Sequence, residues 1–321
     1  MGITMIQTKP TAAHRIPSVL NVGIIAAQLT ALAACFWAAA HTHHWGLILA
    51  LAIAFGILMN SVYSIIHEAE HAMLFPNRSA NEIAGVLMAL FFPAPFHLLR
   101  QGHIGHHLRN RSDDEAFDLY FEGDNVVWKW MVWIGILTGL YYVLVVISNV
   151  VAVFAPFILD RRHFRIGDHV KVDRASSAFL ESFNPAYLRW IWIEGICAIG
   201  LHTAIVLGLR VPLVNYLAMY AAFGFMWSAM QYVHHYGTER HVTRGARNLW
   251  IFGPIDAIWL NHNWHLSHHE HPTVPWVHLP RLVERAEPQR GFLPWAYLKM
   301  WKGPRRTDEH FENKYAGRII Q

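Results

Sequence analysis

Four apolar runs divide the chain, and each has the length of a helix that crosses a membrane. A spanning helix needs about 20 predominantly apolar residues. The runs predict spans over residues 19–40, 45–66, 188–209 and 211–233. Only a tight hairpin around Arg210 and Pro212 separates the last two. This pattern predicts an all-α integral membrane protein with four transmembrane helices.

Two further apolar runs are less regular. Residues 83–98 are interrupted by Pro93 and Pro95, which predicts a helix in the membrane interface or a shallow re-entrant helix. Residues 126–159 are long for one span and short for two, so we expect a re-entrant segment that enters and leaves on one side. Three residues in this second run are candidates for the bend: Gly135, Gly139 and Pro156.

The polar remainder is expected to form a helical cap from residues 67–125, 160–187 and 234–321, so that residues 1–321 are a single domain. The 160–187 linker is rich in Lys and Arg, whereas the short connection over 41–44 has neither. Cytoplasmic loops of membrane proteins carry an excess of these residues. We therefore expect a cytoplasmic cap and a location in a bacterial inner membrane.

The amino-acid composition excludes several classes of protein and of metal site. With 54% hydrophobic and 15% charged residues, the chain is too apolar for an ordinary soluble domain. Its two cysteines are too few for a disulfide framework, a cysteine-based zinc site or an iron–sulfur cluster. Electrons must therefore come from a separate carrier, and the net charge of +4 suits an acidic one. No segment resembles a nucleic-acid-binding module, so we expect no nucleic-acid partner.

Three clusters with helical spacing stand out among the 23 histidines. One reads HxxxH (67–71), and two read HxxHH (103–107 and 265–269). Residues three and four apart on a helix share a face, and neutral imidazole is the commonest metal ligand. Eight imidazoles exceed the four ligands of a tetrahedral zinc and indicate two ions of higher coordination. The eight candidate ligands are His67, His71, His103, His106, His107, His265, His268 and His269.

Three boxes of these forms on a four-span protein resemble the membrane fatty acid desaturase and hydroxylase superfamily. The resemblance implies two iron ions held by histidines alone, with O2 as co-substrate. It also implies a ninth ligand after the last span, and residues 231–237 (QYVHHYG) match that stretch. His235 is the expected ligand, and Gln231 stands where some members have an asparagine that binds a metal-bound water. Residues 235–237 and 268–272 also resemble the alkane monooxygenase branch.

Carboxylates are expected around such a centre, because they orient imidazole ligands through N–H···O bonds and offset positive charge. Among the acidic residues near the boxes we favour Asp114, Asp118 and Asp256. The other candidates are Glu68, Glu70, Asp113, Glu115 and Glu270. Of the remaining histidines, His262 and His271 are the hardest to set aside.

The resemblance implies a lipid or fatty acyl substrate, and fatty acid desaturation is the favoured reaction. Hydroxylation, as in the alkane monooxygenases, and decarboxylation that leaves a 1-alkene use the same boxes and stay open. The resemblance also implies a separate electron donor of the ferredoxin, rubredoxin or cytochrome b5 type.

Two functions of other classes compete with this interpretation. His67-Glu68-x-x-His71 matches the zinc metalloprotease motif, with Glu68 as general base, which would indicate an intramembrane protease. A membrane haem electron carrier needs single histidines inside spans, and only His202 is well placed for that. Either function leaves both HxxHH boxes unexplained.

Overall fold

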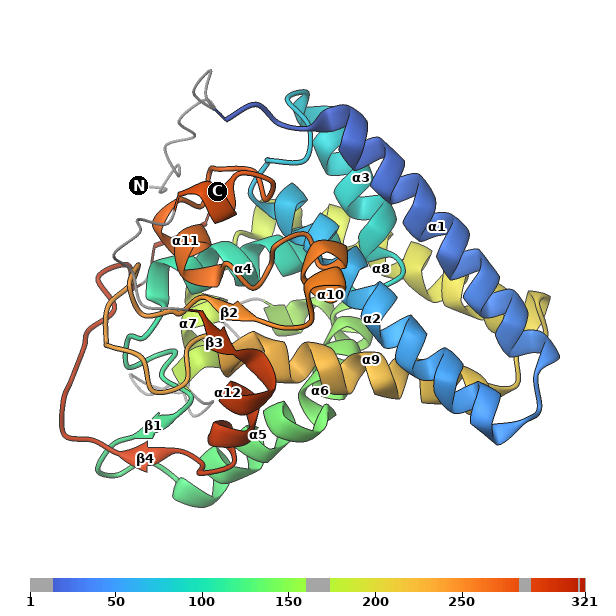
Figure 1. Ribbon diagram of the computed structural model, residues 1–321. Coiled ribbons are helices and arrows are strands. Elements are labelled where there is room, and N and C mark those ends of the chain that lie inside the picture. The colour runs from blue at the N-terminus through green and yellow to red at the C-terminus, as the bar shows by residue number, and fades with distance from the viewer. Residues whose placement is uncertain (1–13, 160–173, 283–289, 317, 321) are drawn as a thin grey trace.

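The computed structural model describes residues 14–159, 174–282, 290–316 and 318–320. Two long antiparallel helices, α1 and α2, project away from a group of shorter helices and loops (Figure 1). The long helices are α1 (Ser18–His41), α2 (Trp45–Glu70), α8 (Leu188–Thr203, continued as the π-helix η4, Ala204–Gly208) and α9 (Leu213–Val233). The shorter α-helices are α3 (Arg78–Ala89), α4 (Phe96–Arg109), α5 (Val126–Thr138), α6 (Leu140–Phe154), α7 (Arg174–Ser182), α10 (Gly253–Ile258), α11 (His265–Glu270) and α12 (Leu293–Met300). Within the described ranges the 3-10 helices are η1 (Pro156–Leu159), η3 (Pro185–Tyr187) and η5 (Leu279–Arg281).

The predicted spans correspond to helices of the structure. Within the described residues, four helical stretches are long and apolar enough to cross a membrane: Ser18–His41, Trp45–Glu70, Pro185–Gly208 and Leu213–Val233. The fold is therefore that of an all-α integral membrane protein, as predicted. The second helix runs to Glu70 rather than residue 66, because His67 to Glu70 are buried and continue the helix into the cap.

Helices α2 and α9 form the centre of the apolar core. Phe55 and Met59 of α2 pack in one buried cluster with Phe223 of α9 and Leu32 of α1. Buried polar side chains join these helices through hydrogen bonds. In apolar surroundings a polar group without a hydrogen-bond partner costs free energy. For example, Asn215 at the start of α9 donates to the carbonyl of Ala39 at 2.8 Å.

Helices α5 and α6 meet at a bend of 99°, which falls at Gly139, one of the three predicted positions. Gly139 has φ +91°, a conformation that costs L-residues free energy and that glycine adopts freely. A Cβ at this position would lie 2.8 Å from backbone atoms of Phe225 in α9. Glycine therefore permits both the turn and the close approach of α9.

The run 83–98 is divided at Pro93 and Pro95 into the end of α3 and the start of α4. Residues 90–92 form the turn after α3 and are followed by prolines, which lack an N–H, so the carbonyls of this turn need other donors. Three consecutive carbonyls receive them from three different helices. The pairs are His202 to Leu90 (2.9 Å), Tyr220 to Phe91 (2.9 Å) and Tyr142 to Phe92 (3.4 Å).

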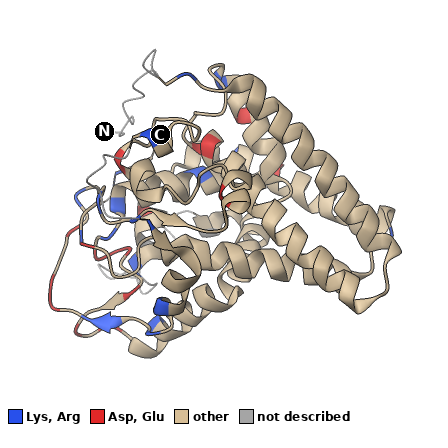
Figure 2. Ribbon diagram, viewed as in Figure 1, with Lys and Arg blue, Asp and Glu red and all other residues tan. Residues whose placement is uncertain are grey.

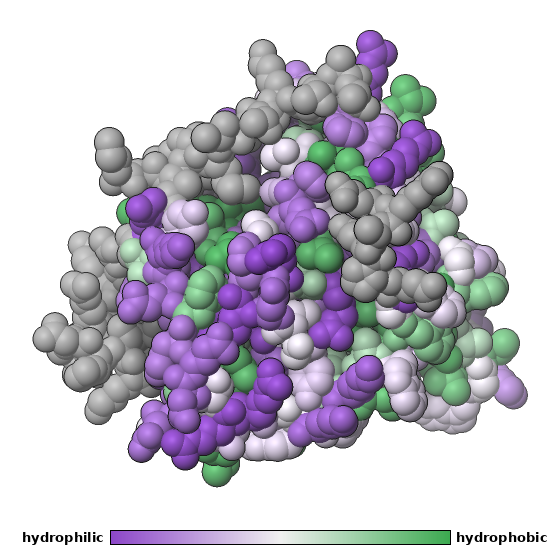
Figure 3. Space-filling model, turned by 60° about the vertical axis from the view of Figure 1, so that its left-hand side comes forward, coloured by the Kyte–Doolittle hydropathy of each residue, from purple (hydrophilic) through white to green (hydrophobic). Residues whose placement is uncertain are grey.

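The cap is closed by two parallel two-residue pairings, β1 (Leu119–Tyr120) with β4 (Arg305–Arg306) and β2 (Leu249–Trp250) with β3 (Gly291–Phe292). Charged residues gather on this side of the molecule, whereas the far ends of α1 and α2 are almost free of them (Figure 2). The face turned forward in Figure 3 is mainly hydrophilic. Residues 160–173 of the predicted basic linker lie outside the described residues.

We predict that Gly139→Ala destabilises the protein, because it places a side chain in the left-handed region, which costs about 1–2 kcal/mol, and drives it into α9. The measurement is the thermal unfolding midpoint in detergent. Gly135→Ala is the matched control, since its Cβ meets nothing closer than 3.6 Å. Equal midpoints for the two variants would contradict this account of the bend.

Candidate metal site

The histidines of the three boxes and His235 lie on four elements of the chain, and their side chains converge. His67 lies in the last turn of α2, and His71 caps that helix. The second box lies within α4, and the third forms the start of α11. His235 follows the end of α9 in a tight turn, where its backbone N–H bonds to the carbonyl of Tyr232.

The nine predicted ligands divide into two groups of converging imidazoles. In each group the ring nitrogens that can bind a metal all lie within 4.8 Å of one another. The five-histidine group is His67, His71, His103, His107 and His268. The four-histidine group is His106, His235, His265 and His269. The groups adjoin, since the rings of His107 and His269 stack with centroids 4.3 Å apart.

In seven of the nine rings the nitrogen that lies close to a neighbouring imidazole is Nε2. In the five-histidine group the Nε2 of His103 lies 2.7 Å from that of His71 and 3.2 Å from that of His107. In the four-histidine group the Nε2 of His265 lies 2.9 Å from that of His235 and 3.2 Å from that of His269. In an octahedral complex with bonds of about 2.1 Å, neighbouring ligand nitrogens lie about 3.0 Å apart. The spacing therefore fits imidazoles arranged around metal ions.

Two rings of the four-histidine group are held by hydrogen bonds on their outer nitrogens. The Nδ1 of His106 lies 2.9 Å from a carboxylate oxygen of Glu115, and that of His235 lies 2.8 Å from the carbonyl of Gly245. These acceptors require a proton on Nδ1, which leaves the Nε2 lone pair for a metal. Arg109 donates to the other oxygen of Glu115 at 2.9 and 3.1 Å, which fixes the carboxylate in turn.

Burial makes the cluster electrostatically unusual. Burial, together with neighbouring cations, lowers the pKa of His71 to about 3, and burial and the other imidazoles lower the pKa of His268 well below its usual value. Burial alone would raise the pKa of Glu115, but Arg109 and His106 outweigh it and hold that pKa at about 2. At neutral pH the imidazoles of His71 and His268 are therefore neutral, and the carboxylate of Glu115 is ionised.

The favoured carboxylates have other partners in the described part of the chain. Asp118 accepts from Arg111, from Tyr232 (2.7 Å) and from the backbone N–H of Gly237 (2.7 Å). Asp114 accepts from Asn313 at 2.9 Å. Glu115, one residue further, contacts His106, while carboxylate oxygens of Glu68 and Glu70 lie 4.0 Å from the Nδ1 atoms of His67 and His103. The ion pair between Glu115 and Arg109 could not be predicted from the sequence, because nothing distinguishes these two residues from the other charged residues near the second histidine box.

Asp256 is linked to the histidine cluster through two other residues, Asn263 and His234. It accepts from Asn263 at 2.5 Å, and the Oδ1 of Asn263 lies 3.3 Å from the Nε2 of His234. The ring of His234 lies 4.6 Å from that of His265. Burial lowers the pKa of His234 to about 3, so this ring is also neutral. Gln231 donates to the carbonyl of Trp227 at 3.3 Å, within its own helix.

The competing functions fit this geometry poorly. Five converging imidazoles exceed the three protein ligands of a catalytic zinc, as a protease would need. His202 uses both ring nitrogens, because Nε2 lies 2.9 Å from the Leu90 carbonyl and Nδ1 lies 2.6 Å from the Tyr216 hydroxyl. It therefore has no nitrogen left to bind a haem iron.

Comparison with known proteins agrees with this geometry. The family model for fatty acid desaturases matches residues 42–304. A beta-carotene ketolase of Paracoccus sp. (strain N81106 / MBIC 01143) is 27% identical over 288 residues, which are 84% of this chain and 96% of the relative.

Two plant relatives are longer than this chain. The sn-2 acyl-lipid omega-3 desaturase (ferredoxin), chloroplastic, of Helianthus annuus is 24% identical over 272 residues, which are 79% of this chain and 58% of the relative. The chloroplastic omega-3 fatty acid desaturase of Glycine max is 22% identical over 310 residues, which are 88% of this chain and 62% of the relative. The chain thus spans about three fifths of these two relatives.

We predict that Glu115→Gln weakens metal binding at the four-histidine group by about 10–100-fold, because His106 and Arg109 lose a charged partner. Metal content per chain and competition with a chelator measure this. Asp113→Asn is the control, since it removes a similar charge that pairs with Arg240 and His310 instead. Equal metal affinity in both variants would show that Glu115 does not orient His106.

We also predict that the chelator-stripped protein loses stability as pH falls below about 6.5. A histidine whose folded pKa is depressed binds fewer protons than in the unfolded chain, so acid favours unfolding. His71, with a folded pKa of about 3, contributes across the whole window from about 6.5 downward. Each such histidine adds up to about 1.4 kcal/mol per pH unit. Unfolding midpoints between pH 7.5 and 5 test this, and a flat profile would contradict it.

Proposed function

The chain belongs to the fatty acid desaturase family, and from this premise we propose that it is an O2-dependent di-iron oxidoreductase acting on an acyl or alkyl chain. The favoured reaction is desaturation of a fatty acyl chain. The observation that carries the proposal is the division of nine imidazoles into converging groups of five and four. The nine residues of these groups are proposed as the iron ligands.

Two irons held in this way supply the chemistry of O2 activation and C–H oxidation. The protein holds the rings at fixed orientations, through Glu115 on His106 and the Gly245 carbonyl on His235. Tyr63, one turn before His67, packs against Phe92 and Trp227.

The reaction needs two electrons from outside the chain. Desaturation converts two CH2 groups, O2, two electrons and two protons into a CH=CH unit and two waters. Both cysteines are free thiols and offer no electron store. A separate donor of ferredoxin, rubredoxin or cytochrome b5 type is therefore proposed, and the name of the sunflower relative includes ferredoxin.

Oxygen insertion is the second candidate. The alignment with the ketolase covers 96% of that protein, whereas those with the plant desaturases cover 58% and 62%. Insertion converts C–H, O2, two electrons and two protons into C–OH and one water. Hydroxylation of an alkyl or polyene chain is thus compatible with the same ligands, as is decarboxylation to a 1-alkene.

The cap is proposed to face the cytoplasm. The connection between α1 and α2 has no Lys or Arg, and that between α8 and α9 has only Arg210. Both connections lie at the ends of the helices away from the cap (Figure 1). The positive-inside bias therefore favours the cytoplasm for the cap and the histidine boxes.

We predict that cells expressing the chain with a suitable electron donor accumulate a new unsaturated, hydroxylated or 1-alkene product, and that His268→Ala abolishes it. Mass spectrometry of lipids, carotenoids and headspace volatiles distinguishes the reactions, and metal analysis should find two irons per chain. His271→Ala is the matched control, since His271 is exposed three residues away. One zinc and no iron, or equal products from the two variants, would contradict the proposal.

A further inference from the structure

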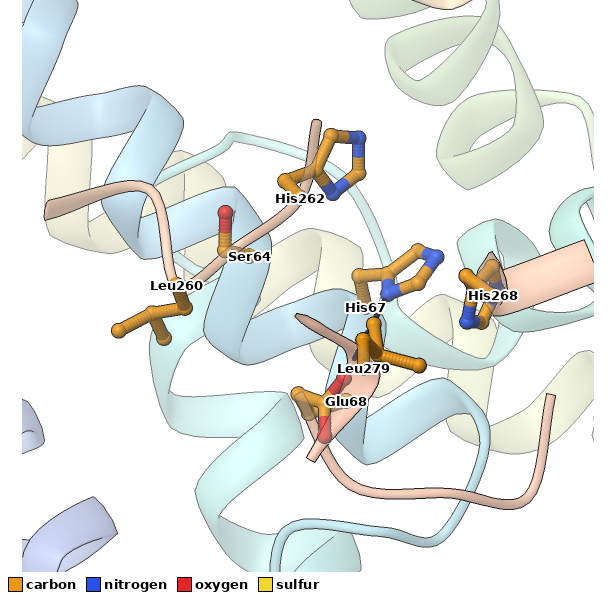
Figure 4. Close-up of a pocket in the computed structure, with 7 residues that line it drawn as sticks. All are labelled: Ser64, His67, Glu68, Leu260, His262, His268 and Leu279. Atoms are coloured by element: carbon orange, nitrogen blue, oxygen red, sulfur yellow. Dashed lines mark ion pairs between the residues drawn. The ribbon is translucent and has the colours of Figure 1, made fainter. Parts of the chain in front are cut away.

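A pocket adjoins the five-histidine group and contains a histidine that belongs to neither group. The residues that line it are Ser64, His67, Glu68, Leu260, His262, His268 and Leu279 (Figure 4). His67 and His268 are members of the five-histidine group. The ring of His262 lies 5.0 Å from that of His67 and 5.6 Å from that of His265. His262 therefore lies beside both groups.

His262 is placed by a turn that is strained. Leu260 and Asn261 both have positive φ, +50° and +56°, although neither is glycine. Such conformations persist only where the surrounding structure enforces them, and they concentrate at functional sites. Here α2 supplies the restraint: Ser64 donates to the carbonyl of Trp259 at 3.0 Å, and the Trp259 indole donates to the carbonyl of Ile57 at 3.0 Å.

The chemistry of the pocket restricts what it can hold. Its enclosed space is about 10 Å³, room for about one water-sized group, so only a very small ligand can reach into it. Leu260 and Leu279 make two walls apolar, and the Glu68 carboxylate accepts the backbone N–H of Trp276 at 3.1 Å. Among the described residues, no hydrogen bond engages the ring of His262. Its N–H is thus available to a small ligand in the pocket.

We infer that His262 is a positioning residue that donates a hydrogen bond to a small ligand entering the five-histidine group from this pocket. The ligand class is a molecule of two or three heavy atoms with a lone pair on oxygen or nitrogen. This inference rests on the proposed function, because it requires a metal ion at that group. His262 is thereby distinguished from the nine ligands, which hold the metal itself.

Azide titration of the oxidised, iron-loaded full-length protein tests the inference, with the ligand-to-metal absorption band as readout. We expect His262→Ala to raise the azide Kd about tenfold with unchanged iron content, because one hydrogen bond to an anion is lost. His262→Gln, which keeps an N–H donor, should recover part of the affinity. His271→Ala should bind azide like the unaltered protein.

The outcomes separate this inference from the proposed function. Unchanged azide affinity in His262→Ala would overturn the inference alone. Loss of iron in that variant, with His271→Ala unaffected, would also overturn it and make His262 a ligand. If the unaltered protein holds no iron or gives no azide band, the proposed function fails and the inference fails with it.

Discussion

Neutral imidazoles that point their lone pairs at one another, away from water, repel unless a cation lies between them. In this protein the Nε2 atoms of neighbouring histidines approach to 2.7–3.2 Å in both groups. Burial also disfavours protonation, which is the other way to relieve this repulsion. A metal ion at each group would satisfy these nitrogens together. The rest of the structure can be understood as the scaffold that holds them close.

That scaffold couples the apolar core to the cap. The packing of α2 against α9 fixes two of the four ligand-bearing elements, since His67 ends one helix and His235 follows the other. The cap adds α4 and α11, and the loop with Glu115 holds α4 through an ion pair with Arg109. A substitution that disturbs the packing of α2 against α9 would therefore move the histidines of these two elements relative to the others.

Local sequence patterns predicted the features that depend on local physics. Run lengths predicted the spans, and the overlong apolar run predicted a bend, for which Gly139 was one of three candidate positions. Box spacing selected eight of the nine imidazoles that converge, because helical periodicity is a property of neighbouring residues, and the family resemblance supplied His235. Tertiary partners were not predictable in this way. Glu115 rather than Asp114 contacts His106, and the Asp256 carboxylate reaches the cluster only through Asn263 and His234.

The three carbonyls of residues 90–92, in the turn after α3, have a consequence for biogenesis. Their donors lie 50 to 129 residues later in the chain, on α6, α8 and α9. During synthesis this segment emerges well before those helices exist, with acceptors that lipid cannot satisfy. It must therefore remain in contact with water or with the insertion machinery until the last span has been made. The hydrogen bonds of this segment in the first half of the chain are therefore complete only after α6, α8 and α9 have been made.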